Sequence, residues 1–211
     1  MKKDRIKDII KILRKTYPNA HTALRHKNPF QLLVATMLSA QCTDERVNRI
    51  TPLLFKKYKT ISDFAKLKRS ELEKEIYSAG FYKNKAKNII AASKKIKTEF
   101  NGHVPDEMDK LIGLPGVARK TANIVLSSSF KKVEGIAVDT HVKRLSGRIG
   151  LSAEKTPVKI EQDLMNIIPK TDWLDFNYLL VSHGRKACTA RKPLCRGCVL
   201  KDLCPFADKI K

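Results

Sequence analysis

Hydrophobic residues recur along most of this chain at intervals of three and four positions, the spacing that predicts amphipathic helices. Segment 30–38 is hydrophobic nearly all round, so its helix should lie at the centre of the fold, with Asn28 as its cap and Pro29 at its first position. A first helix has lysines on one face and, on the other, the apolar residues Ile6, Ile9, Ile10 and Leu13. The only strand-like run, 136–138, is too short to build a sheet, so we predict an all-α fold of nine or ten helices.

Polar residues and glycines mark where other helices should begin and end. Ser70 and Glu73 have the spacing of a capping box, and Gly80 provides the stop for that helix. Asn84 can begin the next helix, which Asn101-Gly102 ends. The remaining predicted helices span residues 118–128, 140–149, 156–168 and 172–183.

Four of the five cysteines are clustered in one stretch near the end of the chain. The two-residue gap between Cys195 and Cys198 permits a turn whose sulfurs face the same point, so the array predicts a bound metal centre. Disulfides would leave Cys42 unpaired, and the N-terminus predicts an amphipathic helix instead of a signal peptide. Four thiolates suit both zinc and an iron-sulfur cluster, and their spacing decides only weakly between the two. The array consists of Cys188, Cys195, Cys198 and Cys204.

The charge of the chain points to a polyanionic partner. Its 211 residues include 43 Lys and Arg against 21 Asp and Glu, a net charge of +22, and the basic residues are spread along the sequence. A genome that favours lysine codons would give a similar excess, so charge favours nucleic acid without proving it. No apolar run approaches the roughly 20 residues of a membrane span, and we expect a protein of a reducing compartment.

Segment 114–120 predicts a tight hairpin turn. Pro115 and Gly116 enforce the turn just before a new helix begins. The backbone N–H groups at that helix N-terminus could hold a DNA phosphate without reading any base, and Arg119 and Lys120 stand beside them. Taken alone, a Pro-Gly turn before a helix is also an ordinary connection between helices.

Taken together, these motifs resemble the endonuclease III family of helix-hairpin-helix DNA glycosylases, over almost the whole chain. One departure is Ala118, where the family's hairpin commonly has glycine; alanine is acceptable if this position has helical dihedrals. The matching segments, besides the cysteine array, are Leu38-Ser39-Ala40-Gln41, Thr43-Asp44, the hairpin 114–120 and Val138-Asp139-Thr140-His141.

The resemblance implies two helical lobes with an active site in the cleft between them. The central lobe would span residues 22–132 and contain the helix-hairpin-helix, and the second lobe would combine 1–21 with 133–211, including the cluster loop 188–204. It implies an enzyme of base excision repair that removes oxidised pyrimidines from duplex DNA and cuts the strand at the abasic site. It also favours a 4Fe–4S cluster over zinc, held by Cys188, Cys195, Cys198 and Cys204.

The resemblance assigns the chemistry to two residues. Lys120 would be the nucleophile that forms a Schiff base with the deoxyribose, followed by β-elimination of the 3′ phosphate. Asp139 would stabilise the cationic sugar or help to deprotonate the lysine. The alternatives are a solvated lysine and a simple N-cap of the helix from Thr140, and capping is compatible with catalysis. His141 is interpreted as structural.

The same resemblance implies which residues touch DNA. A damaged base must be turned out of the stack, and Gln41 and Phe81 would fill the gap that it leaves. Without the family, Gln41 would be a polar residue at a helix end and Phe81 a core aromatic. The predicted hairpin contacts are Leu114, Gly116, Ala118 and Arg119.

Two other functions stay open. A monofunctional mismatch glycosylase of the same superfamily, such as the adenine-removing branch, usually lacks a lysine at the position of Lys120. A DNA-binding module without activity would not need Lys120 and Asp139 together. We expect a cytoplasmic, nucleoid-associated monomer whose partner is duplex DNA with damaged pyrimidines or abasic sites, and no membrane.

Overall fold

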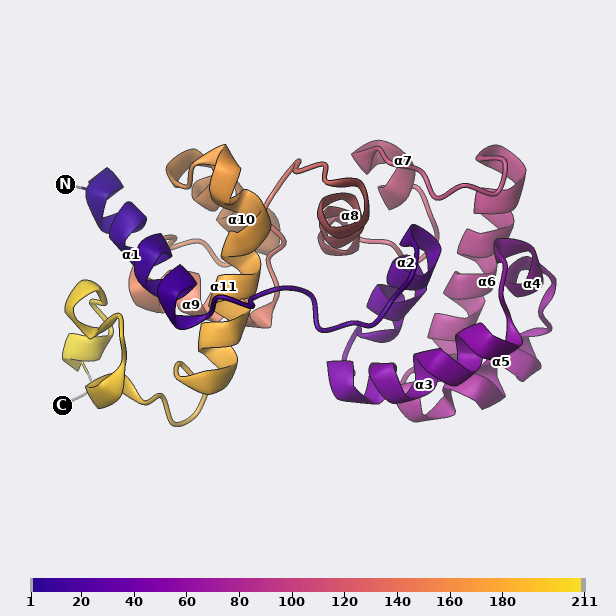
Figure 1. The fold of residues 1–211 in the computed structure, drawn as a ribbon, viewed down its shortest axis with the longest axis horizontal. Helices are drawn as coiled ribbons and strands as arrows, with labels where there is room; N and C mark the ends of the chain where they lie inside the picture. Colours follow the sequence, from indigo (N-terminus) through magenta and orange to yellow (C-terminus); the bar gives the residue numbers. More distant parts are fainter. Residues whose placement is uncertain (1, 210–211) are drawn as a thin grey trace. The chain divides into compact units, whose positions relative to one another are not determined.

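The computed structural model describes residues 2–209, and this part of the chain is helical (Figure 1). The described residues contain eleven α-helices, several short 3₁₀ turns, one π-helical turn and no β-strand, which confirms the all-α prediction and exceeds the nine or ten helices predicted. Three of the helices were not predicted. Two of them, α4 (Ile61–Lys66) and α7 (Met108–Ile112), have too few residues to show a period of 3.6, and α3 (Asp44–Lys57) contains Pro52.

The chain divides into two compact units. Unit 2 is the continuous segment Ala23–Glu134, and unit 1 combines the two flanking segments Met1–Thr22 and Gly135–Lys211. Each unit has a hydrophobic core of its own. That these units are the functional lobes of an enzyme stays a prediction.

Unit 2 is built around α2 (Pro29–Leu38), as its hydrophobic pattern predicts. Every α2 residue from Leu32 to Leu38 is buried, and the helix packs against α3, α6 and α8. The Asn28 Oδ1 accepts the Gln31 N–H at 2.9 Å, which confirms the predicted cap. Besides α2, α3, α4 and α7, this unit contains α5 (Arg69–Ile76), α6 (Tyr82–Glu99) and α8 (Arg119–Val125).

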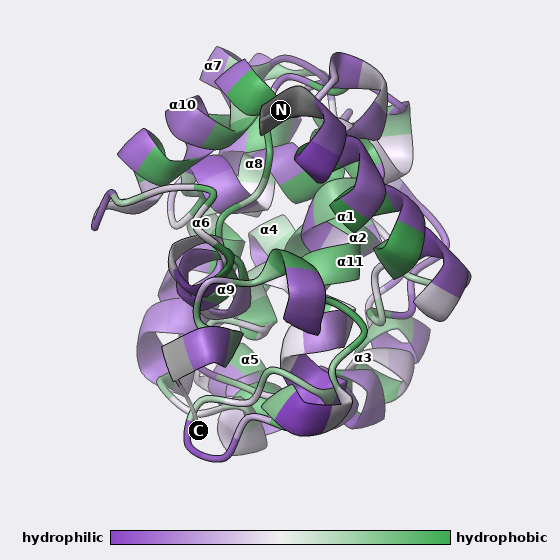
Figure 2. Cartoon of the chain, turned by 90° about the vertical axis from the view of Figure 1, so that its left-hand side faces the viewer, coloured by the Kyte–Doolittle hydropathy of each residue, from purple (hydrophilic) through white to green (hydrophobic). Residues whose placement is uncertain are grey.

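In unit 1, α11 (Trp173–Lys186) packs against both α1 (Lys2–Thr16) and α9 (Thr140–Ile149). The predicted apolar face of α1 is buried, and Figure 2 shows hydrophilic and hydrophobic residues alternating along its turns. Helix α10 (Pro157–Ile167) packs against α9, and the chain after α11 continues as short 3₁₀ turns.

The predicted start of α5 is wrong. Helix α5 begins at Arg69, with Lys68 as its N-cap residue, and the Glu71 Oε2 accepts the Lys68 N–H at 3.1 Å. Glu73 instead pairs with Arg69 on the helix surface, at 2.6 Å. Both Glu71 and Glu73 lie within reach of the first turn. Ser70 and Glu73 have the capping-box spacing, but each stands two residues after the residue that forms the actual cap.

The start of α6 is also earlier than predicted. The helix begins at Tyr82 and not at Asn84, and its N-cap residue is Phe81, with a left-handed backbone at φ 46°. Its end agrees with the prediction, because Asn101 and Gly102 both adopt positive φ after the last turn.

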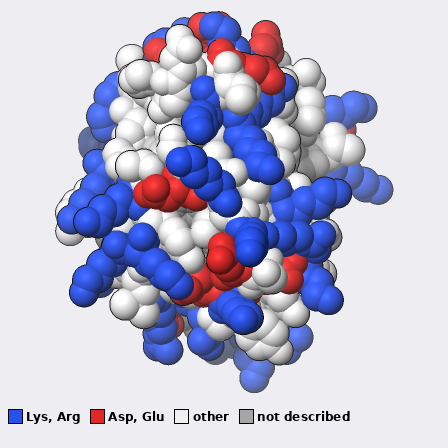
Figure 3. Space-filling view, turned by 90° about the vertical axis from the view of Figure 1, so that its right-hand side faces the viewer, with Lys and Arg blue, Asp and Glu red and all other residues white. Residues whose placement is uncertain are grey.

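Charge is distributed over the surface. Figure 3 shows one face of the molecule, on which Lys and Arg side chains spread widely and Asp and Glu form small groups between them. Within residues 2–209, no helix is both long and apolar enough to cross a membrane.

Candidate nucleic-acid interface and metal centre

The predicted hairpin lies between α7 and α8 of unit 2. The Leu114 side chain is buried, only 2% exposed, and its N–H donates to the Leu111 O at 3.0 Å. The Val117 N–H donates to the Leu114 O at 3.1 Å and closes the turn. Because its side chain belongs to the core, Leu114 can reach DNA only through its backbone.

Gly116 is required in this turn for two reasons. Its φ of +77° is a conformation that L side chains rarely adopt. A Cβ at this position would also lie 2.7 Å from the Asn88 Cβ. The hairpin backbone therefore passes closer to α6 than any other residue would allow.

Ala118 is the N-cap residue of α8, with φ −90° and ψ 165°. The condition set for alanine, helical dihedrals at this position, is not met, because the backbone is extended. Alanine is nevertheless accommodated, since a negative φ with extended ψ is open to every L residue. Alanine at this position thus carries no backbone strain.

Arg119 and Lys120 occupy the first turn of α8, and both side chains are exposed. By helix geometry, the first N–H groups of α8 have no carbonyl partner within the helix. Exposed cations beside such amides form a surface suited to a phosphate group. The position of Lys120 leaves its amine accessible to a bound substrate.

A hollow in unit 2 brings together three of the predicted DNA-contacting residues from three separate segments. Gln41 lies in the turn after α2 with φ +52°, and Phe81 precedes α6 with 65% of the residue exposed. The alternative of a core aromatic at Phe81 is therefore wrong. The residues that line the hollow are Met37, Ala40, Gln41, Phe81, Asn84, Lys85, Asn88 and Gly116.

Asp139 belongs to unit 1 and is half-buried before α9. Its Oδ1 accepts the Val142 N–H at 2.8 Å, so the residue is the N-cap of α9, as one of the two interpretations predicted. His141 lies near Arg144, with 3.1 Å between its Nδ1 and the Arg144 Nη2. A catalytic role of Asp139 stays a prediction.

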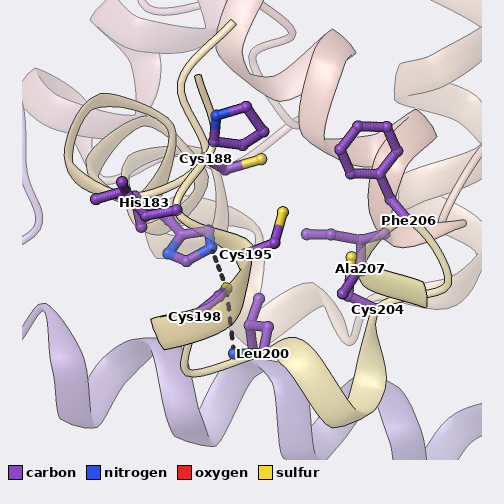
Figure 4. Close-up of a pocket in the computed structure, with 12 residues that line it drawn as sticks. His183, Cys188, Cys195, Cys198, Leu200, Cys204, Phe206 and Ala207 are labelled. Atoms are coloured by element: carbon purple, nitrogen blue, oxygen red, sulfur yellow. Dashed lines mark hydrogen bonds between the residues drawn. The ribbon is translucent and has the colours of Figure 1, made fainter. Parts of the chain in front are cut away.

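The four cysteines of the C-terminal array line one small hollow of unit 1 (Figure 4). All five cysteines of the chain, which fall within the described range, are free thiols. The hollow is otherwise mostly apolar, with Leu200 and Phe206 among its lining residues. Within residues 2–209, no three His, Cys, Asp or Glu side chains are grouped closely enough to hold one metal ion.

Hydrogen-bond donors reach the sulfurs from outside the array. The Arg148 Nη1 donates to the Cys188 Sγ at 3.3 Å, and the Leu200 N–H donates to the Cys198 Sγ at 3.4 Å. The pKa of the Cys198 thiol is raised, because burial raises it by more than the hydrogen bond from the Leu200 N–H lowers it. Four thiols with such donors fit an iron-sulfur cluster, in which each cysteine binds a different iron and the sulfurs need not meet at one ion.

Three residues around this hollow were missed in the sequence. Arg148 also donates to the Thr189 O at 2.7 Å, and Arg144 donates to the Cys188 O at 3.1 Å. The Nε2 of the buried His183 lies 3.4 Å from the Cys198 Sγ. Arg144 and Arg148, four apart on one helix, share a face by their spacing, but no local pattern indicates that this face meets the cysteine array.

Comparison with known families gives two matches on this chain. Residues 34–170 match the HhH-GPD superfamily of base excision DNA repair proteins. Residues 188–204, from the first to the last cysteine of the array, match the iron-sulfur binding domain of endonuclease III.

Similar proteins span nearly the whole chain. Endonuclease III of Synechocystis sp. is 54% identical over 207 residues, which cover 98% of this chain and 94% of the relative. Endonuclease III of Bacillus subtilis is 48% identical, over 92% of this chain and 88% of the relative. A solved structure of a trapped endonuclease III–DNA covalent intermediate superposes with a TM-score of 0.94 at 44% identity, covering 98% of this chain and 97% of that one.

Proposed function

The chain belongs to the endonuclease III family of base excision DNA repair enzymes, and on that premise we propose that it excises oxidised pyrimidines through Lys120 and Asp139. As a member of this family it is a DNA glycosylase and abasic-site lyase with a 4Fe–4S cluster. The observation that carries the residue assignment is the exposure of Lys120 in the first turn of α8, directly after the hairpin.

Lys120 acts as the nucleophile in this proposal. Its neutral amine forms a bond to C1′ of the deoxyribose, and the bond from C1′ to the base breaks, so that the base leaves with the electron pair and takes up a proton. The nitrogen electron pair then forms a C=N bond to C1′ while the C1′–O4′ bond breaks and O4′ takes up a proton, so the sugar ring opens to a Schiff base. Loss of a proton from C2′ then expels the 3′ phosphate by β-elimination, which cuts the strand. The endonuclease III that this chain resembles was trapped as a covalent intermediate with DNA, which supports covalent chemistry here.

Asp139 supports the departure of the base. An ionised carboxylate stabilises the positive charge that develops on the sugar, and it can accept the proton that Lys120 gives up. The bond from the Val142 N–H holds one carboxylate oxygen in place, so the N-cap also orients the second oxygen. The proposal requires Asp139 and Lys120 to act on the same nucleotide.

The proposed contacts to the DNA backbone read no sequence. The hairpin amides from Leu114 to Ala118 and the Arg119 guanidinium bind backbone phosphates, which position the duplex. Gln41 fills the gap beside the orphaned base through its amide, and Phe81 does so as an apolar wedge between bases. The shared hollow and the exposure of Phe81 support this assignment.

The ligands of the cluster in this proposal are the four cysteines of the array. When bound, the cluster would hold the short turns that follow α11 together as one folded loop. The role proposed for the cluster is therefore structural. Arg148 and the Leu200 N–H orient and stabilise the Cys188 and Cys198 thiolates. The four ligands are Cys188, Cys195, Cys198 and Cys204.

We further propose that the enzyme is a cytoplasmic monomer associated with the nucleoid. One duplex segment is the only partner that the chemistry requires. The net charge of +22 supports retention on DNA between encounters with damage.

The deciding experiment is borohydride reduction of the protein mixed with duplex DNA that contains one abasic site. We expect a covalent adduct, together with excision of thymine glycol from a second duplex. A glycosylase without lyase activity would excise a base and give no adduct, and an inactive DNA-binding module would do neither. Excision of adenine from a mismatch with no action on thymine glycol would contradict the proposed substrate.

A further inference from the structure

Lys85 is a buried lysine that the chemistry described above does not use. It lies in the first turn of α6, and only 7% of the residue is exposed. Its Nζ donates to the Leu38 O at 2.7 Å and to the Ala79 O at 2.8 Å. One ammonium group thus joins two backbone segments, of which one lies 47 residues away in the sequence.

The two carbonyl groups stand at the ends of the elements that lead into the gap-filling residues. Leu38 is the last residue of α2, and Gln41 follows three positions later with φ +52°. Ala79 ends the 3₁₀ turn before Gly80, and Phe81 follows with φ +46°. Left-handed backbone at residues other than glycine persists only where the surroundings hold it in place. The contacts of Lys85 therefore fall where such a constraint is needed.

Burying the charged group of Lys85 costs free energy of desolvation, which its contacts must offset. Burial lowers the pKa of Lys85, and the nearby Cys42 thiol opposes that shift. In the part of the chain that the structure describes, no carboxylate pairs with Lys85, so its compensation comes from the two carbonyl oxygens. A hydrophobic residue of the same length would avoid the desolvation and lose both bonds.

We propose that Lys85 is a positioning residue, a clamp that fixes the spacing between Gln41 and Phe81 so that both enter the base stack together. This inference rests on the proposed gap-filling role of those two residues. The side chain lines the same hollow as Gln41 and Phe81, and its bonds end on the two segments that carry them. Loss of the clamp would let the two turns move independently, which slows extrusion of the damaged base and leaves the reaction at the sugar intact.

The test compares three variants. Lys85→Met keeps the length and packing of the side chain and removes both hydrogen bonds. Lys85→Arg keeps the charge and the donors and should restore most of the function. Ile89→Ala, one turn further along α6 and likewise buried, is the matched control that weakens the core and leaves both bonds in place.

Single-turnover rates separate extrusion from chemistry. On a thymine-glycol duplex, Lys85→Met should be slower than wild type by between about 10- and 100-fold. On an abasic site in single-stranded DNA, where there is no stack to fill, its rate of cleavage and its borohydride adduct should match those of wild type. Fluorescence of 2-aminopurine placed opposite the thymine glycol should rise more slowly by the same factor. Equal losses on both substrates, or equal losses in Ile89→Ala, would overturn the clamp.

A double-mutant cycle tests whether Lys85 acts through the gap-filling pair. In a Gln41→Ala, Phe81→Ala background, Lys85→Met should add less than about a 2-fold further loss on the duplex, because the clamp has nothing left to position. A full additional loss would overturn the proposal while leaving the pair's own role intact. If the Gln41→Ala, Phe81→Ala protein itself behaves as wild type, the gap-filling role fails first and the clamp with it.

Folding of the key variant is checked by circular dichroism. Should Lys85→Met fail to fold, Lys85→Gln takes its place, because its amide keeps donors on a shorter side chain. The expected duplex defect is then smaller and still absent on single-stranded DNA. A Lys85→Gln protein with wild-type duplex rates would overturn the proposal.

Discussion

Lys120 is the residue on which the proposed strand cleavage depends, and it differs from the many other exposed lysines only in its place after the hairpin. Lys120→Gln should abolish the borohydride adduct and strand cleavage even on a preformed abasic site, because the proposal assigns the Schiff base to the Lys120 amine. DNA binding should survive. Gel analysis of the adduct measures this, with Lys97→Gln, an exposed lysine of α6, as the control that loses the same charge. Robust trapping by Lys120→Gln would remove Lys120 as the nucleophile.

Asp139 caps α9 and is proposed to act in catalysis, and one pair of variants separates the two roles. Asp139→Asn keeps an N-cap oxygen for the Val142 N–H, so stability should change by only a few tenths of a kcal/mol, whereas Asp139→Ala should lose about 1 kcal/mol. Excision of thymine glycol by Asp139→Asn should fall by at least about 100-fold, and abasic-site cleavage by less, because that substrate has no base to expel. Single-turnover rates on the two duplexes decide. Equal losses would assign Asp139 to activation of the lysine.

The residue-level assignments show what a sequence can supply. The cysteine array and the hairpin could be predicted from the sequence because each motif is local. Asp139 could be predicted as an N-cap because Val142, its partner, lies three residues away. The contacts of Lys85 and Arg148 could not be predicted, since Lys85 bonds Leu38, 47 positions away, and Arg148 bonds Cys188, 40 positions away. Contacts between distant segments depend on how the helices pack, which local patterns do not encode.

At the scale of elements, the hairpin shows why a glycine is needed at a particular turn. Gly116→Val should weaken binding to all duplex sequences alike, because the proposed amide contacts to phosphate carry no base information. Two effects of the substitution would distort the hairpin. The positive φ costs an L residue roughly 1–2 kcal/mol, and the new Cβ would collide with Asn88. Binding titrations on damaged and undamaged duplexes measure the effect.

Gly102 offers a matched control for that substitution. Its φ of +74° is nearly the same, and a Cβ there meets nothing within 4 Å. Gly102→Val therefore carries the same backbone strain without the displacement of the hairpin, and it should bind DNA as wild type does. A loss of affinity as large as that of Gly116→Val would show that strain alone, and not the course of the hairpin, explains the effect.

Helix ends were predictable where one signal stood alone and not where two competed. Asn28 with Pro29 and Asp139 before Thr140 each gave a start that the structure confirms. The start of α5 was wrong because Glu71 and Glu73 both lie in reach of its first turn. The start of α6 carries no side-chain cap at all, since a left-handed Phe81 occupies the cap position. This irregular helix start lies at a residue that is proposed to enter DNA. Sequence rules for helix capping are expected to fail at such functional positions.

At the scale of the whole molecule, the cluster is the cofactor whose loss should be visible without any assay. Anaerobically purified protein should be brown, with about four irons and four sulfides per chain. Cys42→Ala should keep that content, because Cys42 lies in unit 2 in the turn after α2, whereas Cys188→Ala should lose it and leave the C-terminal loop unfolded. Metal analysis and absorbance measure both. Zinc in place of iron would contradict the cluster.

The charge of the molecule decides how it meets undamaged DNA. If the excess of 22 positive charges serves binding, affinity for an undamaged duplex should fall steeply with salt, since each neutralised phosphate contributes about −0.9 to the slope of log K against log salt. The spread of basic side chains over the surface in Figure 3 favours several such contacts. Lys97→Gln gives the scale of a single charge, because it should change the slope by no more than about one. Titrations between low and physiological salt test this, and a nearly flat plot would show that the charge reflects composition, leaving the hairpin to supply the binding.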